Sequence, residues 1–133
     1  MAIAVPGELK GYVEAKEKFG NPDLSLLDIM KPTIDLCENG FQVTRSLERA
    51  INQLDTKEKF DDNLKEEFTN PITGQYYKKG DIIRRTEYAT TLRKIAESGS
   101  SDIFYQGEIG QSIVQEIQDL GGIITMEDMR SYQ

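Results

Sequence analysis

The sequence predicts a mainly α fold, a compact set of several helices, and three observations support this. Apolar residues recur at steps of three and four, for example at Ile113 and Ile117, which is the spacing of one helix face. Glycine and proline interrupt these runs at intervals of about a helix length. Thr125 with Asp128 has the spacing of a helix capping box, with Asp in place of the usual Glu or Gln.

The first half of the chain predicts helices separated by turns. Ser25 with Asp28 is a second pair with capping spacing. Pro32 lacks a backbone N–H, so we expect the helix that Ser25 opens to break there and a separate short helix to run from Pro32 to Glu38. Asn39-Gly40 should close that helix in a left-handed turn. The other expected features are a helix from Glu8 to Phe19 with Leu9, Tyr12, Val13 and Lys16 on one face, a connector at Phe41-Gln42-Val43, and a helix capped by Thr44 with Leu47, Ala50, Ile51 and Leu54 on one face.

The second half gives the clearest helix, from Thr86 to Glu97, which Gly99 ends. Before it, the charged stretch from Asp55 to Glu67 is interpreted either as a marginal helix or as a loop anchored by aromatic residues. The remaining expectations are a turn at Asn70–Gly74, a short strand at Tyr76-Tyr77, an apolar stripe of Tyr88, Leu92, Ile95 and Ala96, a helical turn at Asp102–Tyr105 capped by Ser100 or Ser101, and a helix at Glu108–Leu120 with Ile109, Ile113, Ile117 and Leu120 as its seam.

Composition limits the possible functions. With 133 residues, one domain covering residues 1–133 is expected. The net charge of −7 argues against a nucleic-acid partner, and the absence of histidine removes the commonest general base and zinc ligand. Cys37 is the single cysteine and is expected to be a small buried residue. No metal or other cofactor is expected.

Four groups of residues are candidates for chemical sites, and a structural role is favoured for the first three. Thr90-Thr91 falls inside a predicted helix, whereas a threonine nucleophile of the N-terminal type needs a free amine. The paired carboxylates lack the loop spacing of a calcium site. Gly121-Gly122 is interpreted as a helix stop in preference to an oxyanion cradle. Arg84-Arg85, near Lys78-Lys79, is compatible with binding of a carboxylate, with a solvated loop or with a partner surface. The carboxylate pairs are Asp61-Asp62, Glu66-Glu67 and Glu127-Asp128.

Short motifs follow one another in a fixed order along nearly the whole chain. They are Ala4-Val5-Pro6-Gly7-Glu8 with Gly11-Tyr12, Ala15 with Phe19-Gly20, Pro32-Thr33-Ile34, Asn39-Gly40-Phe41-Gln42-Val43, Lys79-Gly80-Asp81, Ala89-Thr90-Thr91-Leu92, Ile95-Ala96-Glu97-Ser98-Gly99, Phe104-Tyr105-Gln106-Gly107, Gly121-Gly122-Ile123 with Thr125 and Glu127-Asp128, and Tyr132. In this order the motifs resemble the large subunit of γ-glutamyltransferases. Thr86, Tyr88 and Lys16 depart from the family pattern, which usually has Pro and Leu at the first two places and often His at the third.

This resemblance implies an internal fragment of an αββα N-terminal-nucleophile hydrolase. The parent enzyme would cleave the γ-glutamyl bond of glutathione and its conjugates and pass the γ-glutamyl group to water, amino acids or peptides through an acyl-enzyme on an N-terminal threonine. The resemblance places the nucleophile and its oxyanion glycines beyond Gln133 and the substrate-binding arginine before Met1. No catalytic, cofactor-binding or metal-binding residue is therefore expected here.

The expected partners are the rest of the large subunit and the small catalytic subunit, with self-association of the isolated fragment. The resemblance suggests an extracellular, membrane-anchored or periplasmic parent. The alternatives are a non-catalytic helical interaction domain of a diverged homologue and a related acylase.

Overall fold

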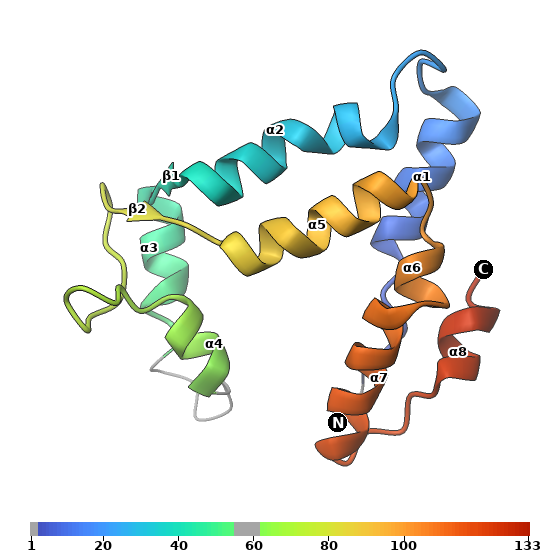
Figure 1. Cartoon of the computed structure of the whole chain (residues 1–133). Helices are drawn as coiled ribbons and strands as arrows, with labels where there is room; N and C mark the ends of the chain where they lie inside the picture. Colours follow the sequence, from blue (N-terminus) through green and yellow to red (C-terminus); the bar gives the residue numbers. More distant parts are fainter. Residues whose placement is uncertain (1–2, 55–61) are drawn as a thin grey trace. The chain divides into compact units, whose positions relative to one another are not determined.

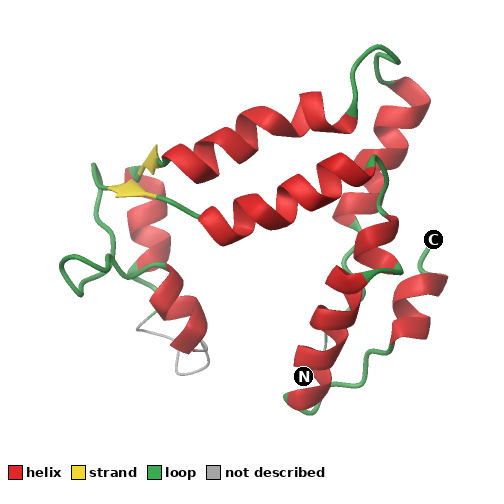
Figure 2. Ribbon diagram, in the orientation of Figure 1, coloured by secondary structure: helices red, strands yellow, loops and turns green. Residues whose placement is uncertain are grey.

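The computed structural model describes residues 3–54 and 62–133, and helices dominate this part of the chain (Figure 2). The mainly α prediction is confirmed for it. In chain order, as Figure 1 labels them, the elements are α1 (Glu8–Phe19), α2 (Leu26–Asn39), β1 (Phe41–Gln42), α3 (Arg45–Ile51), α4 (Asp62–Glu67), β2 (Ile82–Ile83), α5 (Thr86–Ser98), α6 (Asp102–Tyr105), α7 (Glu108–Asp119) and α8 (Met126–Ser131).

Contacts group the chain into two compact units. One contains residues 1–34 and 87–133, and the other contains residues 35–86. This grouping describes packing and does not test whether the chain folds as one domain, so that expectation stays a prediction.

The predicted break at Pro32 is wrong, because α2 continues through this residue. A proline inside a helix removes one hydrogen bond and costs about 3 kcal/mol. Leu26, Ile34 and Cys37 lie along α2 and are all buried, and each fully buried side chain of this kind contributes about 1.5–3 kcal/mol. Burial of Leu26 before Pro32 and of Ile34 and Cys37 after it therefore outweighs the local cost of this proline. The burial of Cys37 confirms its expected role.

Helix ends follow the local sequence closely. Thr44 caps α3 by accepting the backbone N–H of Leu47 at 3.2 Å. The Ser25 hydroxyl accepts the backbone N–H of Asp28 at 3.0 Å, and an Asp28 carboxylate oxygen accepts the backbone N–H of Ser25 at 2.8 Å. These bonds form the two halves of the predicted capping box. Gly40 ends α2 with a left-handed φ of 94°, as predicted.

At the start of α6, only one of the two serines expected to cap this helix makes a side-chain capping bond. The Ser100 hydroxyl accepts the backbone N–H of Asp102 at 3.1 Å, whereas Ser101 makes no side-chain capping bond. Ser100 therefore supplies the side-chain acceptor.

Three large residues placed on predicted apolar faces are exposed instead. They are Tyr12 on α1 (63% exposed), Tyr88 on α5 (43%) and Leu120 after α7 (63%). The buried positions of α5 are Ala89, Ile95 and Ala96, and those of α7 are Gly110 and Val114. A helix's periodicity limits which residues share a face, but the elements packed against the helix decide how far that face extends.

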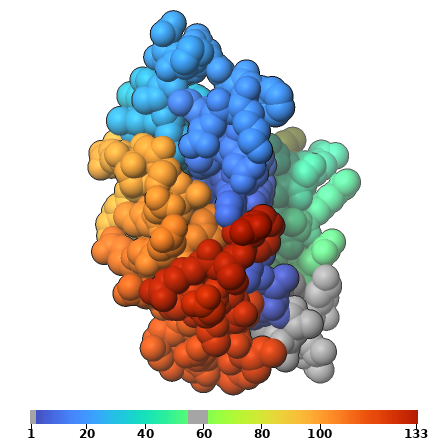
Figure 3. All heavy atoms as spheres, turned by 90° about the vertical axis from the view of Figure 1, so that its right-hand side faces the viewer, coloured from blue at the N-terminus to red at the C-terminus, as the bar shows by residue number. Residues whose placement is uncertain are grey.

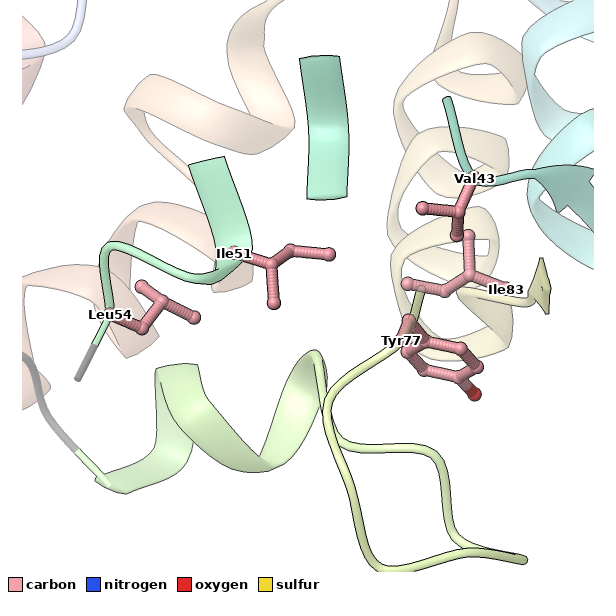
Figure 4. Close-up of a cluster of buried hydrophobic side chains, with 5 residues drawn as sticks. All are labelled: Val43, Ile51, Leu54, Tyr77 and Ile83. Carbon is pink, nitrogen blue, oxygen red and sulfur yellow. The ribbon is translucent and has the colours of Figure 1, made fainter. Parts of the chain in front are cut away.

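The unit of residues 35–86 contains a β ribbon that the sequence did not predict. Phe41, expected in a connector, pairs with Ile83 across the antiparallel strands β1 and β2. The strand expected at Tyr76-Tyr77 is reduced to a single bridge between Thr69 and Tyr76. A core lies beside the ribbon, and Figure 4 shows its buried side chains, which are Val43, Ile51, Leu54, Tyr77 and Ile83.

The charged stretch is partly described. Residues 62–67 form α4, while residues 55–61, including Phe60 and Asp61, lie outside the described residues. The turn predicted at Asn70–Gly74 is confirmed, because the backbone N–H of Gly74 donates to the Asn70 carbonyl at 2.8 Å.

Candidate functional site

Thr90 and Thr91 lie inside α5, as the structural interpretation required. The Thr91 hydroxyl donates to the backbone carbonyl of Glu87 at 3.3 Å, one turn earlier in the same helix. A threonine nucleophile of the N-terminal type needs a free α-amine beside its hydroxyl. Neither residue meets that requirement within a continuous helix.

The acidic pairs contribute to helix ends and to an ion pair. Glu127 and Asp128 occupy the first turn of α8, where negative charge is favourable. The Glu67 carboxylate accepts from Arg85 at 2.6 Å. Within residues 3–54 and 62–133, no group of three or more His, Cys, Asp or Glu side chains could hold a metal ion.

Arg85 connects three parts of the unit of residues 35–86. Its guanidinium pairs with Glu67 and lies 6.0 Å from the centre of the Phe68 ring. Its backbone N–H donates to the Cys37 carbonyl at 2.8 Å. Lys78 donates to the Gln75 side chain at 3.0 Å. Arg85 therefore has a structural role within its own unit.

Gly121-Gly122 forms the predicted helix stop. Gly121 has a φ of 78°, and its N–H donates to the Gln118 carbonyl at 2.9 Å. The N–H of Gly122 donates to the Ile117 carbonyl at 2.7 Å. This pair of bonds is the Schellman motif, so both backbone donors are used in ending α7 and are not available to bind an oxyanion.

A connected group of polar and aromatic residues lies where the first and last segments of the described chain meet. We call Pro6, Gly7, Lys10, Tyr105 and Tyr132 the tyrosine junction. The Tyr105 hydroxyl donates to the Pro6 carbonyl at 2.6 Å and accepts the backbone N–H of Lys10 at 3.3 Å. The rings of Tyr105 and Tyr132 stack 5.9 Å apart and 6° from parallel. In Figure 3 the red C-terminal residues lie against the blue N-terminal ones.

The junction supplies caps that the local sequence does not provide. The N-cap of α1 is Gly7, which has no side chain to accept a helix N–H. The Tyr105 hydroxyl fills this role because it accepts the N–H of Lys10, the third residue of α1. At the C-terminal end of α8, the Lys10 ammonium donates to the backbone carbonyl of Tyr132, which is the C-cap residue of that helix. A cation at a helix C-terminus is favourable.

The Tyr132 ring occupies the space beside Gly7. A β-carbon placed on Gly7 would lie 2.7 Å from the Tyr132 Cζ atom and closer still to its hydroxyl. Tyr132 in turn packs on a buried cluster that includes Val114, Ile124 and Met129. The Pro-Gly of the first motif and the last tyrosine of the final motif therefore occupy one packed site.

The Tyr105 hydroxyl of this junction is partly buried and fully hydrogen-bonded within the chain. Burial is the main cause that raises the pKa of the Tyr105 hydroxyl above its ordinary value, so the hydroxyl is neutral at physiological pH. Among the described residues, no buried side-chain nitrogen or oxygen lacks a hydrogen-bond partner. The tyrosine junction therefore stabilises the fold.

The residue that sequence reasoning missed is Lys10. No role was expected for it from the sequence, yet it bonds to Tyr105, 95 positions later in the chain, and to Tyr132, 122 positions later. Its ammonium also lies about 6 Å from the ring centres of Tyr105 and Tyr132. The only signal in the sequence was its place inside the Pro6-Gly7 to Gly11-Tyr12 motif.

Comparison with known proteins gives one consistent result. The model of the gamma-glutamyltranspeptidase family matches residues 1–133. The chain is 39% identical over 133 residues to Scoloptoxin SSD14 from Scolopendra dehaani, covering all of this chain and 22% of that protein. It is 39% identical over 132 residues to glutathione hydrolase proenzyme 2 from Schizosaccharomyces pombe, covering 99% of this chain and 21% of that protein.

Solved structures agree with the sequence relatives. The Helicobacter pylori gamma-glutamyltranspeptidase matches with a TM-score of 0.85 and 28% identity, over 96% of this chain and 36% of the other. This chain spans only about a fifth of the length of the two relatives named above. The family match covers every residue, and the motifs of the tyrosine junction pack together at one site. The chain therefore belongs to the gamma-glutamyltranspeptidase family.

Proposed function

We propose that this chain is part of an enzyme that cleaves the γ-glutamyl bond of glutathione and its conjugates. The enzyme transfers the γ-glutamyl group to water, amino acids or peptides through an acyl-enzyme on an N-terminal threonine outside these residues. The role of residues 1–133 is to form a helical scaffold of the large subunit. The isolated chain is inactive, because its candidate groups Thr90-Thr91, Glu127-Asp128 and Gly121-Gly122 serve as helix and helix-stop residues.

One observation carries this proposal: the family match extends over residues 1–133 without leaving out either end. The structure adds a physical link between the first and last motifs. Motifs near both ends of the sequence build one junction, so a change in either would disturb the other.

The remaining partners belong to the same proposal. They are the rest of the large subunit and the small catalytic subunit. Among the described residues, no helix has the length and apolar composition needed to cross a membrane. A site of action outside the cytoplasm follows from the family resemblance. Self-association of the isolated chain is also proposed, because Phe19 is 87% and Ile123 is 89% exposed.

A chimera tests this function. Residues 1–133 would replace the aligned segment of the S. pombe proenzyme, and turnover of γ-glutamyl-p-nitroanilide would be measured together with cleavage into two subunits. We expect the chimera to be cleaved and active, and the isolated chain to show no turnover. Saturable turnover by the isolated chain would contradict the scaffold role.

A folded chimera that is cleaved but inactive would favour the alternative of a non-catalytic interaction domain. Activity on acylase substrates in place of γ-glutamyl compounds would favour a related acylase. The unmodified S. pombe proenzyme is the matched control for folding, cleavage and turnover.

A further inference from the structure

Asn39-Gly40 brings together a side chain and a backbone nitrogen that can react with each other. When glycine follows asparagine, no side chain shields the backbone nitrogen, so this nitrogen can attack the carbonyl carbon of the asparagine side chain. Asn39 is exposed, which gives water access to that carbon. No other asparagine of the sequence is followed by glycine. The pair therefore has the chemistry of a spontaneous deamidation site.

The fold requires glycine at the second position of this pair. Gly40 has a left-handed φ of 94°, which residues with a β-carbon rarely adopt. A β-carbon on Gly40 would also lie only 2.5 Å from the Cγ2 atom of Ile82. Ile82 belongs to β2, and β1 follows α2 directly and pairs with β2 (Figure 1). The close approach of the ribbon to the end of α2 therefore keeps a reactive pair at this place.

Two hydrogen bonds hold the reacting groups apart in the folded chain. The backbone N–H of Gly40, which contains the attacking nitrogen, donates to the Leu36 carbonyl at 2.9 Å. The Asn39 side-chain amide donates to the Asp35 carbonyl at 2.9 Å. Asn39 is the last residue of α2, so the N–H that follows it is aligned with the preceding turn of the helix. Ring closure requires both bonds to break and this turn to open.

We propose that Asn39-Gly40 is a latent deamidation site that the last turn of α2 keeps unreactive. This inference does not depend on the proposed function. In the open turn, the Gly40 nitrogen forms a bond to the side-chain carbonyl carbon of Asn39, and ammonia leaves with the proton of the backbone N–H. A cyclic succinimide results, and water then opens it at either carbonyl to give aspartate or isoaspartate. The net reaction exchanges ammonia for water and needs no oxidant.

The product weakens the turn that protects the site. A carboxylate cannot donate to the Asp35 carbonyl, so one of the two hydrogen bonds is lost. The new negative charge lies at the C-terminus of α2, where the helix dipole opposes it, and one turn after the Asp35 carboxylate. Isoaspartate also adds a carbon to the main chain between α2 and β1. Deamidation therefore marks chains in which the end of α2 has opened.

Mass spectrometry of peptides measures the reaction at every asparagine of the chain. The chain would be incubated in mildly alkaline buffer, once folded and once in guanidinium chloride, with circular dichroism to verify each state. Asn21 and Asn70 are internal controls, because the proline after each has no N–H. Asn52 and Asn63 precede residues with large side chains and control for shielding of the nitrogen. The S. pombe chimera repeats the folded measurement in a longer protein.

In denaturant, we expect Asn39 to deamidate faster than every other asparagine. In the folded chain its rate should fall roughly four- to hundredfold, because each of the two hydrogen bonds lowers the population of the open turn by roughly two- to tenfold.

A helix-weakening variant tests the last turn of α2 itself. Leu36 is 54% exposed, so Leu36→Gly weakens this turn without emptying a core. It should raise the folded-state rate at Asn39 by about two- to fivefold. Leu120→Gly is the matched control in the other unit, because Leu120 is 63% exposed, and it should leave the rate at Asn39 unchanged.

Several results would overturn the inference. One is an Asn39 rate that is equal in the folded and denatured states, in both the chain and the chimera. Another is a rate in denaturant no faster than that of Asn63. A folded-state rate that Leu36→Gly does not change, or that Leu120→Gly raises equally, would show that the last turn of α2 does not control the reaction. Asn39→Asp should lower the urea midpoint of unfolding, and an unchanged midpoint would contradict the weakening by the product.

Discussion

Replacing Gly7 by alanine is expected to destabilise the chain through one contact, with the Tyr132 ring. Gly7 has φ −102° and ψ −12°, which alanine also adopts, so the backbone does not oppose the change. The new β-carbon would overlap the Tyr132 hydroxyl and lie 2.7 Å from its Cζ atom. The ring cannot turn away freely, because it stacks on Tyr105 and its residue's carbonyl binds Lys10.

The magnitude follows from these contacts. Overpacking costs about 1–3 kcal/mol, and a displaced aromatic pair forfeits about 0.5–1.5 kcal/mol. Against this, replacing glycine by alanine stabilises by about 0.4–1 kcal/mol through the unfolded chain. We therefore expect Gly7→Ala to lower the free energy of unfolding by about 1–3 kcal/mol.

A double-mutant cycle isolates the contact. In a Tyr132→Ala background the overlap is gone, so Gly7→Ala should become neutral or stabilise by up to about 1 kcal/mol. Urea unfolding followed by circular dichroism would measure all four proteins. An equal loss in both backgrounds would refute the reasoning, because the cost would then arise elsewhere than at Tyr132.

Two further predictions follow, the first on glycines inside helices and the second on the pH dependence of stability. Gly110→Ala in α7 should destabilise by about 1–3 kcal/mol because the β-carbon would overlap the Phe104 carbonyl, whereas Gly11→Ala in α1, which meets open space, should stabilise by about 0.5–1 kcal/mol. Thermal melting of the two variants checks the opposite signs.

Hydrogen bonds from Thr125 lower the pKa of Asp128 in the folded state, so its stabilising effect is present above the unfolded-state pKa and is lost as pH falls through the folded-state value. Unfolding midpoints measured from about pH 5 downward should fall less in Asp128→Asn than in the parent chain.

The sequence by itself determined the local features of this fold. The Thr125–Asp128 capping box, the Thr44 cap and the glycine stop at Gly121 were all predicted, and all are present. Each depends on hydrogen bonds between residues no more than five positions apart. The order of its motifs also indicated the family, because each motif can be recognised without knowing what it contacts.

Only the tertiary structure decided which local preferences prevailed and which distant residues met. Burial on both sides of Pro32 kept α2 continuous, against the preference of proline. The pairing of Phe41 with Ile83 spans more than forty residues, and the bond between Lys10 and Tyr132 spans 122. Burial and pairing over such separations depend on where whole elements pack, and no local pattern encodes that position.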